Sequence, residues 1–320
     1  MAGCSSSKKD KTALQGVTVS MEPGDLTFDT DSAIANIRHQ VEFGPRVPGS
    51  DGHKKAEQFI LNKMKDYGAD TIIEQKGEVT AFNGDVLPFN NILARFNTKA
   101  DKRILLLAHY DTRPWADNEK NTDDRKKPIL GANDGGSGTG VIMEIARVIG
   151  DNNLPLGVDF LFVDAEDYGT NQGWGGNEES WCLGSQYWAD HHPYGIDEMP
   201  MFGILLDMVG GINARFHREF FSDKAARPIV DKVWSTASSL GFSGVFINEL
   251  GGSLIDDHNN INRAGIPCID IVECNNAVTG SFPPTWHTLH DNMSSIDPKS
   301  IKAVGTTVLR VIENEAKTMQ

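Results

Sequence analysis

The sequence predicts an α/β protein of three layers, in which a central, mixed but mostly parallel sheet carries helices on both faces. Short apolar runs alternate along the 320 residues with longer segments whose apolar side chains recur at helical spacing. Strands separated by helices of such length pair mostly in parallel and are covered on both faces. No internal repeat and no long linker interrupts this pattern, so we expect a single folded domain over residues 26–320.

Several runs have the length and composition of strands. Some of them are apolar almost throughout, as expected for strands that are buried on both faces rather than on one. The run Arg-Ile-Leu-Leu-Leu-Ala is the clearest example. The predicted strands are 89–96, 103–108, 158–163, 202–209, 245–248 and 268–272.

Between these runs lie segments with the apolar spacing of helices. The predicted helices are 33–43, 54–67, 138–149, 228–240 and 298–313. In open α/β sheets, ligands bind just beyond the carboxyl ends of the strands. The residues that follow each strand-like run are therefore the first place to search for a functional site.

The N-terminal residues 1–25 differ from the rest of the chain. Cys4 follows Ala-Gly and precedes a polar run, Ser-Ser-Ser-Lys-Lys-Asp-Lys, which cannot bury a helix or a strand. This segment resembles the end of a bacterial lipoprotein signal, in which the cysteine carries lipid. We therefore expect a disordered tether, lipid-anchored at Cys4, and a periplasmic location in a bacterial cell envelope. An unstructured end without lipid is the alternative.

Charge and hydropathy exclude several classes of partner. The formal net charge is −14, which argues against binding to nucleic acid or to an anionic membrane surface. No run approaches the roughly 18 apolar residues that a membrane-spanning helix requires. The cysteines form no C-x-x-C pair, and Cys268 lies in an apolar run, where we expect a buried thiol.

Side chains that can bind a metal follow four of the predicted strands. Any one of them could instead cap a helix or occupy a solvated turn. Four strands that bring such groups to the same edge of one sheet are harder to explain in that way. The residues are His109 and Asp111 after the run at 103–108, Asp164, Glu166 and Asp167 after 158–163, Asp207 within 202–209, and Glu273 after 268–272.

Two further candidates lie in loops. Asp134 stands in the glycine-rich stretch Gly-Ala-Asn-Asp-Gly-Gly-Ser-Gly, and His287 stands in Pro-Pro-Thr-Trp-His-Thr. The glycine stretch matches neither a phosphate-binding G-x-x-x-x-G-K-[ST] loop nor a G-x-S-x-G nucleophile elbow. Histidines and carboxylates without a cysteine cluster form a mixed N/O ligand set, which suits zinc in an open catalytic site.

The order of these residues resembles that of the co-catalytic zinc aminopeptidases, a metallopeptidase family, from about Asp31 to Glu313. In that family two zinc ions share a bridging aspartate, a position that Asp134 matches here. The resemblance implies that His109 and Asp207 complete one zinc site, and that Asp167 and His287 complete the other. Glu166 would be the base that activates water.

A narrower resemblance is to the glutaminyl cyclases, which share this fold. Four segments are similar to their signatures: Ala-His-Tyr-Asp at 108–111, Ile-Leu-Leu-Asp-Met-Val-Gly at 204–210, Asp-Asp-His at 256–258 and Phe-Pro-Pro-Thr-Trp-His-Thr-Leu-His-Asp-Asn at 282–292. The resemblance implies one catalytic zinc per chain, held by Asp134, Asp167 and His287. The animal members carry two glutamates where this chain has Glu166 and Asp167, so the shorter aspartate must reach the metal from a shifted backbone.

The resemblance implies a reaction in which the α-amine of an N-terminal glutamine attacks its own γ-carboxamide. Pyroglutamate forms and ammonia leaves, so peptides or proteins with N-terminal glutamine are the expected partners. Glu166 would carry the proton from the amine to the leaving nitrogen, while Asp207 and Asp256 hold the reacting nitrogens and keep Glu166 partly protonated. The predicted pocket wall is Trp286, Phe282 and Trp174.

Two other functions compete with this interpretation. The first is a two-zinc aminopeptidase, in which His109 is a metal ligand. In the cyclase, by contrast, His109 and Asp111 are a hydrogen-bonded framework around the site. The second is a non-catalytic binding domain of this fold, which predicts broken ligand positions, and none is broken here.

Overall fold

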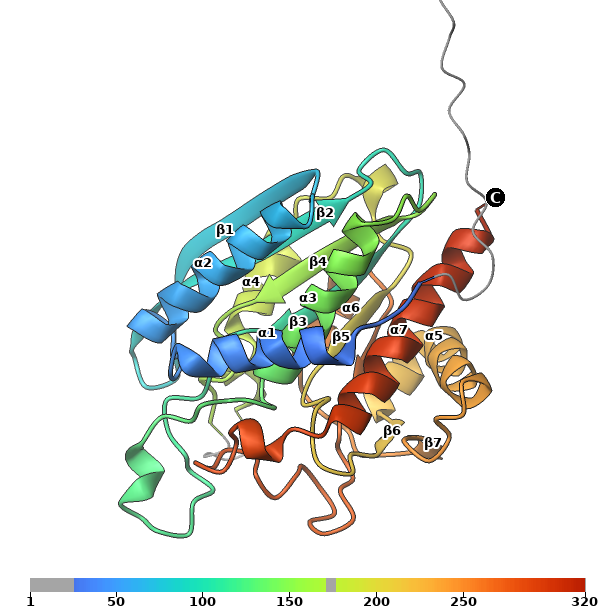
Figure 1. The fold of residues 1–320 in the computed structure, drawn as a ribbon. Helices are drawn as coiled ribbons and strands as arrows, with labels where there is room; N and C mark the ends of the chain where they lie inside the picture. The colour runs from blue at the N-terminus through green and yellow to red at the C-terminus, as the bar shows by residue number, and fades with distance from the viewer. Residues whose placement is uncertain (1–25, 171–176, 320) are drawn as a thin grey trace, which may run out of the picture.

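The computed structural model describes residues 26–170 and 177–319 (Figure 1). Its centre is a six-stranded mixed sheet of order β1-β2-β4-β3-β5-β8. The first two pairings are antiparallel, and the three that involve β3, β4, β5 and β8 are parallel. The strands are β1 (Thr71–Thr80), β2 (Val86–Phe96), β3 (Arg103–His109), β4 (Gly157–Val163), β5 (Gly203–Leu206) and β8 (Cys268–Ile271).

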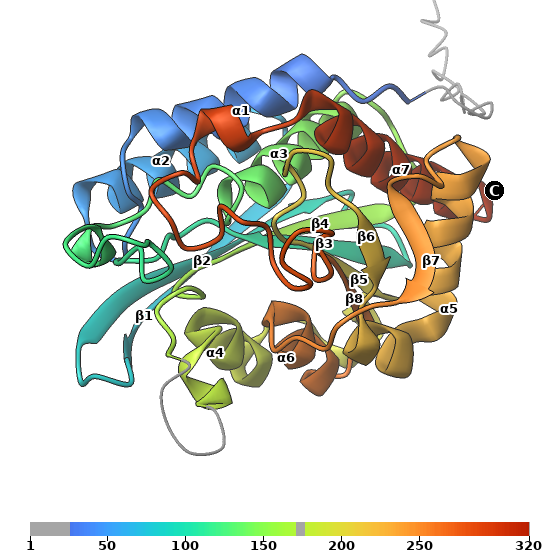
Figure 2. The same ribbon diagram turned by 90° about the horizontal axis from the view of Figure 1, so that it is seen from below.

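Helices cover both faces of this sheet (Figure 2), which confirms the predicted three-layer class. Alternate residues of β3 serve the two layers, as the period of a strand requires. Ile104 and Leu106 belong to the larger core under α1, α3 and α7, and Leu105 and Leu107 belong to the smaller core under α4 and α6. The helices are α1 (Thr30–Glu42), α2 (Asp51–Asp66), α3 (Gly136–Gly150), α4 (Leu183–His191), α5 (Phe220–Ser239), α6 (Asp257–Arg263) and α7 (Pro298–Lys317).

Side-chain caps fix where several helices begin. Asp29 accepts the backbone N–H groups of the first turn of α1, and Ser50 caps α2 in the same way. Asp297 caps α7, whose first residue, Pro298, needs no hydrogen-bond partner there. Glu219 caps α5 by accepting two backbone N–H groups. These caps satisfy donors that the helix itself leaves free.

Some elements differ from the sequence prediction. Helix α5 begins at Phe220 rather than at 228, because a kink at Ala226 lets Pro228 lie inside it. The segment predicted as a strand at 245–248 does not join the central sheet. It is β7 (Phe246–Leu250), which pairs with β6 (Phe216–Arg218) in a separate two-stranded sheet. The strand β1 and the short helices α4 and α6 were not predicted.

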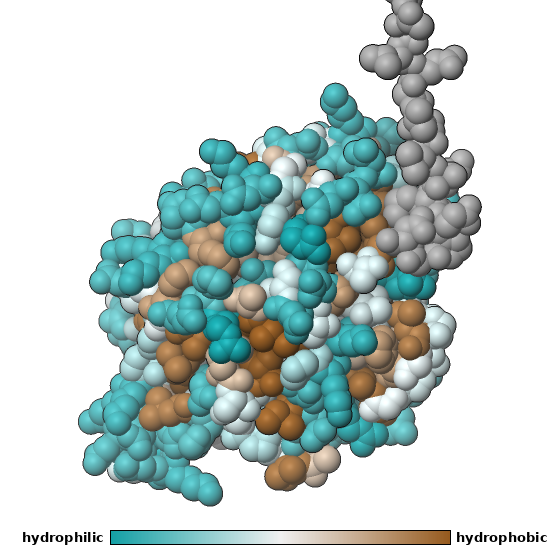
Figure 3. Space-filling view, in the orientation of Figure 1, coloured by the Kyte–Doolittle hydropathy of each residue, from teal (hydrophilic) through white to brown (hydrophobic). Residues whose placement is uncertain are grey.

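Short 3₁₀ turns complete the described chain: Asp124–Lys126, Glu178–Ser180, Ile196–Glu198 and Met293–Ser295. Among the described helices, none is long and apolar enough to cross a membrane. Hydrophilic residues dominate the face shown in Figure 3, and the apolar residues exposed on it form small separate groups.

Candidate active site

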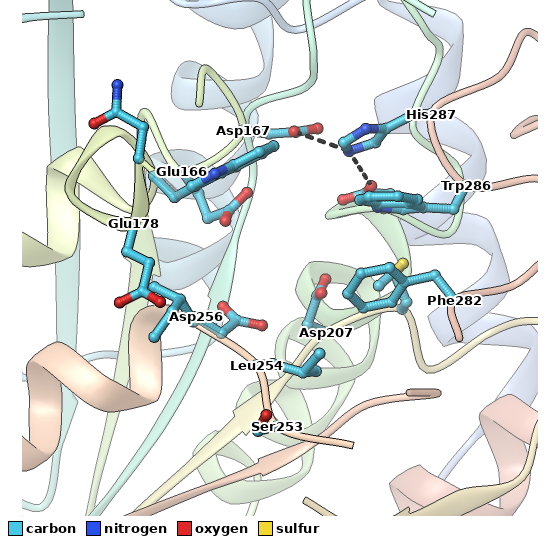
Figure 4. A pocket seen from close by; sticks show the side chains of 15 residues that line it. Glu166, Asp167, Glu178, Asp207, Ser253, Leu254, Asp256, Phe282, Trp286 and His287 are labelled. Atoms are coloured by element: carbon cyan, nitrogen blue, oxygen red, sulfur yellow. Dashed lines mark ion pairs between the residues drawn. The ribbon is translucent and has the colours of Figure 1, made fainter. Parts of the chain in front are cut away.

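The predicted ligand residues meet at the carboxyl ends of the parallel strands. His109 ends β3, and Asp207 directly follows β5; Glu166 and Asp167 follow β4 by a few residues. Except for His109, these residues line a pocket of about 290 Å³ (Figure 4). The pocket is lined by Asp134, Glu166, Asp167, Asn177, Glu178, Trp181, Asp207, Met208, Ser253, Leu254, Ile255, Asp256, Phe282, Trp286 and His287.

Asp134, Asp167 and His287 form a group that fits zinc. Nε2 of His287 lies 3.2 Å from Oδ1 of Asp167 and 3.7 Å from Oδ2 of Asp134. Two ligand atoms bound to a tetrahedral zinc lie roughly 3.2 to 3.6 Å apart, so this spacing is suitable. All three side chains are buried, and Oδ2 of Asp167 has no hydrogen-bond partner among the described residues. A buried, unpaired carboxylate oxygen is expected where a cation binds.

A second group shares Asp134 with the first. Nε2 of His109 lies 3.1 Å from Oδ1 of Asp134 and 3.2 Å from Oδ1 of Asp207. The structure therefore brings together both ligand sets that the resemblances imply, with Asp134 in the shared position. The geometry alone is suitable for one or two ions.

Asp111 belongs to neither ligand set. Its two carboxylate oxygens accept the backbone N–H groups of Glu166 and Asp167, each at 3.1 Å. Oδ1 of Asp111 also lies 3.5 Å from Nδ1 of His109. Asp111 thus holds the backbone from which Glu166 and Asp167 project.

A carboxylate that the sequence analysis missed orients His287. Oδ1 of Asp117 lies 3.3 Å from Nδ1 of His287, which directs Nε2 toward the ligand set. Arg113 donates to both oxygens of Asp117 and to Oδ1 of Asp167. Burial alone would raise the pKa of Asp117, but hydrogen bonds from Arg113 and His287 hold it well below its ordinary value. The only sequence signal was the i, i+4 spacing of Arg113 and Asp117 after the His109 motif.

A second missed residue, Asp291, holds the loop that carries Asp134. Its two oxygens accept the backbone N–H groups of Asn133 at 2.8 Å and of Asp134 at 3.0 Å. Burial, helped by the charge of Asp134, raises the pKa of Asp291 to about 7. Asp291 lies within the glutaminyl cyclase signature at 282–292, which was the available signal.

The other acidic groups of the pocket have pKa values that suit proton transfer. In Figure 4, Asp207 and Asp256 lie across the pocket from Asp167 and His287. Burial raises the pKa of Asp207 to about 6, and burial together with the charge of Asp207 raises that of Asp256 to about 7. Burial raises the pKa of Glu166 well above its usual value, and the charges of Asp167 and Asp256 add to this. The charge of Asp256 thus raises the pKa of Glu166, and the charge of Asp207 raises that of Asp256.

Aromatic rings cover the ligand histidine. The ring of Trp286 stacks on His287 with centroids 3.8 Å apart, and Phe282 lies 4.3 Å from Trp286. Trp181, which the sequence analysis did not select, also lines the pocket and stacks on His287 from 6.0 Å. The predicted wall residue Trp174 lies outside the described residues.

Three non-glycine residues next to the chemical groups have left-handed backbone conformations. They are Ala165 (φ 51°), Met208 (φ 48°) and His287 itself (φ 54°). Such conformations are unfavourable for L-residues and gather at functional sites, where the surrounding structure enforces them. The backbone conformation at these positions therefore fixes the directions in which the neighbouring side chains project.

Two strand-end acids stay apart from the ligand sets. Asp164 is paired with the buried His53 at 2.8 Å and accepts the hydroxyl of Tyr110. Glu273 accepts from Asn276 and does not line the pocket. Both lie at the predicted sheet edge, but their partners give them structural roles.

Comparison with known proteins agrees with this geometry. The model of peptidase family M28 matches residues 91–312. The crystal structure of Bacteroides thetaiotaomicron glutaminyl cyclase bound to N-acetylhistamine is 47% identical, with a TM-score of 0.86, over 91% of this chain and 99% of that chain. A leucine aminopeptidase precursor from Bacteroides thetaiotaomicron is also 47% identical, with a TM-score of 0.84, over 90% of this chain and 97% of that chain.

A curated relative is more distant. The glutaminyl-peptide cyclotransferase of Drosophila melanogaster is 25% identical over 301 residues, which are 86% of this chain and 79% of that protein. The family match, the overall identity to solved structures and the ligand geometry together show that the chain belongs to peptidase family M28.

Proposed function

We propose that this chain is a zinc-dependent glutaminyl-peptide cyclotransferase, which converts the N-terminal glutamine of peptides or proteins to pyroglutamate and releases ammonia. One observation carries the proposal: Asp207 and Asp256 lie across one pocket from the zinc-type ligands Asp167 and His287, and Glu166, next to Asp167, lines the same pocket. Burial raises the pKa of all three acids. Groups of this kind can take up and return protons near neutral pH, as ring closure requires. The similarity to glutaminyl cyclases supports the same activity.

Asp134, Asp167 and His287 would hold the zinc, which acts as a Lewis acid on the γ-carbonyl of the glutamine. The nucleophile is the substrate's own α-amine, so the pocket only has to fold the side chain back toward it. Glu166 takes the proton that the amine loses when the new C–N bond forms. The same carboxyl group then returns a proton to the amide nitrogen, which leaves as ammonia when the old C–N bond breaks.

Asp207 and Asp256 would accept hydrogen bonds from the reacting nitrogens. Both carboxyl groups are buried and lie on the side of the pocket away from His287. Trp286 and Phe282 form an apolar wall for the methylene groups of the glutamine. This wall also keeps water from the carbonyl carbon, where attack by water would give glutamate instead of the ring.

We propose one catalytic zinc per chain. A cyclase brings its own nucleophile in the substrate amine, so it needs only one Lewis acid. His109 contacts Asp134 and Asp207 through Nε2 and Asp111 through Nδ1, and it would then complete the framework around the zinc ligands.

A two-zinc aminopeptidase is the second candidate. It is favoured by the spacing of His109, Asp134 and Asp207, which could also hold an ion, and by the likeness to the leucine aminopeptidase precursor. Such an enzyme needs a hydroxide between two ions about 3.5 to 4 Å apart, so its second ion is indispensable.

One assay separates the two enzymes. Zinc-loaded protein is incubated with a Gln-peptide and with a Leu-peptide, and ammonia, free amino acid and bound zinc are measured. We expect ammonia from the Gln-peptide, no leucine from the Leu-peptide and one zinc per chain. The variant His109→Ala should keep that zinc. Leucine release that rises with a second equivalent of zinc would favour the aminopeptidase.

For the location we propose a lipoprotein of the bacterial periplasm. The support is the Ala-Gly-Cys sequence that ends at Cys4 and the polar run behind it. Labelled palmitate should be incorporated in a bacterial host that expresses the lipoprotein precursor, and it should not be incorporated after Cys4→Ala. Equal labelling of both proteins would contradict the proposal.

A further inference from the structure

The pocket changes in character from its floor to its mouth. The metal-ligand group and the carboxylates of Asp207 and Asp256 are buried at its floor. At the mouth, Asn177, Glu178 and Ser253 are exposed, and Ile255 is 38% exposed. The volume of about 290 Å³ is at the lower end of the range of roughly 300 to 1,000 Å³ for ligand pockets. The pocket therefore accommodates one terminal residue, and the next residue of a peptide must lie at the mouth.

Glu178 is the acidic group of that mouth. It begins the turn Glu178–Ser180, and Figure 4 shows it across the pocket from Phe282 and Trp286. Within the described parts of the chain, no ion pair or hydrogen bond engages its carboxylate. Among the described residues, no lysine or arginine lines the pocket. The carboxylate of Glu178 therefore faces whatever residue the mouth receives.

The mouth of the pocket suits a long cationic side chain. Leu254 and Ile255 line the same pocket as Glu178, and the side chain of Ile255 offers exposed apolar surface. Lysine and arginine side chains lay their methylene stems along apolar surface and keep the charged head in water. A lysine or arginine side chain could lay its methylene groups along Ile255 and direct its charged group toward Glu178. Aspartate or glutamate at the same place would meet a like charge with no cation to offset it.

We propose that Glu178 is a specificity-determining residue, which favours peptides with lysine or arginine directly after the N-terminal glutamine and disfavours those with aspartate or glutamate there. This inference rests on the proposed cyclotransferase activity and names the substrates it prefers. The charge acts at an exposed site, so its effect is modest and is screened by salt.

The test compares two amidated tripeptides, Gln-Lys-Ala and Gln-Glu-Ala, by kcat/KM for ammonia release. At low salt we expect wild-type protein to favour the lysine peptide about five- to tenfold, from attraction to one peptide and repulsion of the other. The isosteric Glu178→Gln should reduce this ratio to about twofold or less, and Glu178→Lys should invert it. Sodium chloride at about 0.5 M should reduce the wild-type ratio at least by half.

Glu179→Gln is the matched control. Glu179 is exposed in the same turn, but it does not line the pocket, so its replacement should leave the ratio unchanged. A wild-type preference for the lysine peptide below threefold would overturn this inference but not the proposed cyclotransferase activity. An equal fall of the ratio in Glu178→Gln and Glu179→Gln would do the same. If no Gln-peptide releases ammonia, the proposed activity fails and the inference fails with it.

Discussion

At the residue scale, three aspartates that do not line the pocket hold residues that do. Asp111 fixes the backbone of Glu166 and Asp167, Asp117 orients His287, and Asp291 holds the loop of Asp134. Buried groups with fixed partners have little freedom to reorganise, which is what catalysis by electrostatic stabilisation needs. The pocket is therefore largely formed before substrate binds.

Replacement of the proton carrier should separate chemistry from metal binding. Glu166→Gln removes the carboxylate but touches no zinc ligand, so turnover should fall about 10²- to 10⁴-fold while zinc stays bound. Asp134→Ala is the contrasting variant and should lose the zinc itself. Kinetics and metal analysis on both proteins check this. A Glu166→Gln protein with more than a tenth of wild-type activity would show that Glu166 is not the proton carrier.

Asp117 should control the affinity for zinc from outside the ligand set. Asp117→Asn removes the charge that orients His287, and loss of such a partner typically weakens metal binding about 10- to 100-fold. Competition with a chelator measures the change. Asp124→Asn, in the same loop but paired with the exposed Lys127, is the control and should bind zinc as wild type does. Equal zinc affinity in all three proteins would contradict the role of Asp117.

At the element scale, the site depends on how α3 meets the end of β5. A Cβ atom added to Gly138 would lie 1.9 Å from the carbonyl oxygen of Leu206, so only glycine allows this approach. Asp134 lies just before α3 and Asp207 directly follows Leu206. The close contact of helix and strand therefore brings both carboxylates to the same atom, Nε2 of His109.

Gly138→Ala should destabilise the protein although alanine favours helices by about 1 kcal/mol. The added methyl group must push α3 away from β5, and overpacking of this kind costs about 1 to 3 kcal/mol. Urea denaturation measures the loss. Gly195→Ala is the control, since no atom lies within 4 Å of its added Cβ. If Gly138→Ala were as stable as this control, the close approach would not be essential.

Some elements could be predicted because their own composition marks them. Others could not, because they depend on contacts with the rest of the fold. The strands that carry His109 and Asp207 are apolar over most of their length, and their composition alone marks them. Strand β1 has charged residues along an exposed edge and is held by its pairing with β2, so its own sequence gave a weak signal. Helix α6 has seven residues, too few for a periodic pattern.

The same distinction holds within the site. His109, Asp167 and Asp207 end or follow strands and could be selected from their position. Asp134 and His287 lie in loops, and they were selected from the motifs around them. Asp117 could not be selected in either way, because it meets His287 only when two loops far apart in sequence join, as in the hydrogen bond from Asn118 N–H to His287 C=O. Contacts of this kind depend on the complete fold rather than on local pattern.

At the scale of the whole molecule, the buried acids link stability to pH. Asp256, Asp257 and Asp291 have pKa values of about 7 in the folded chain, because burial disfavours their charge. In the unfolded chain such groups titrate near 3.9. Between these values the folded chain binds more protons than the unfolded one, so its stability falls as pH rises. His109, whose pKa is raised when folded, contributes in the same direction.

The zinc-free protein should therefore lose thermal stability between pH 5 and pH 7.5. Zinc should raise Tm more at pH 7.5 than at pH 5, because protons compete with the metal for Asp167 and His287 at low pH. Differential scanning calorimetry with and without zinc at both pH values tests this. A zinc-free protein that is more stable at pH 7.5 than at pH 5 would mean that these acids do not retain their protons in the fold.

Asp111 accepts hydrogen bonds from two successive backbone N–H groups, and this limits how the site can be redesigned. The backbone of Glu166 and Asp167 is held as one unit by Asp111. A longer side chain at position 167 would fit only if this backbone moved away from the zinc site, and Glu166 would then move with it. Metal preference and proton transfer thus cannot be tuned one at a time by exchanging the side chains that perform them. Laboratory evolution toward another metal should find its first useful changes at Asp111 and its neighbours, where both are adjusted together.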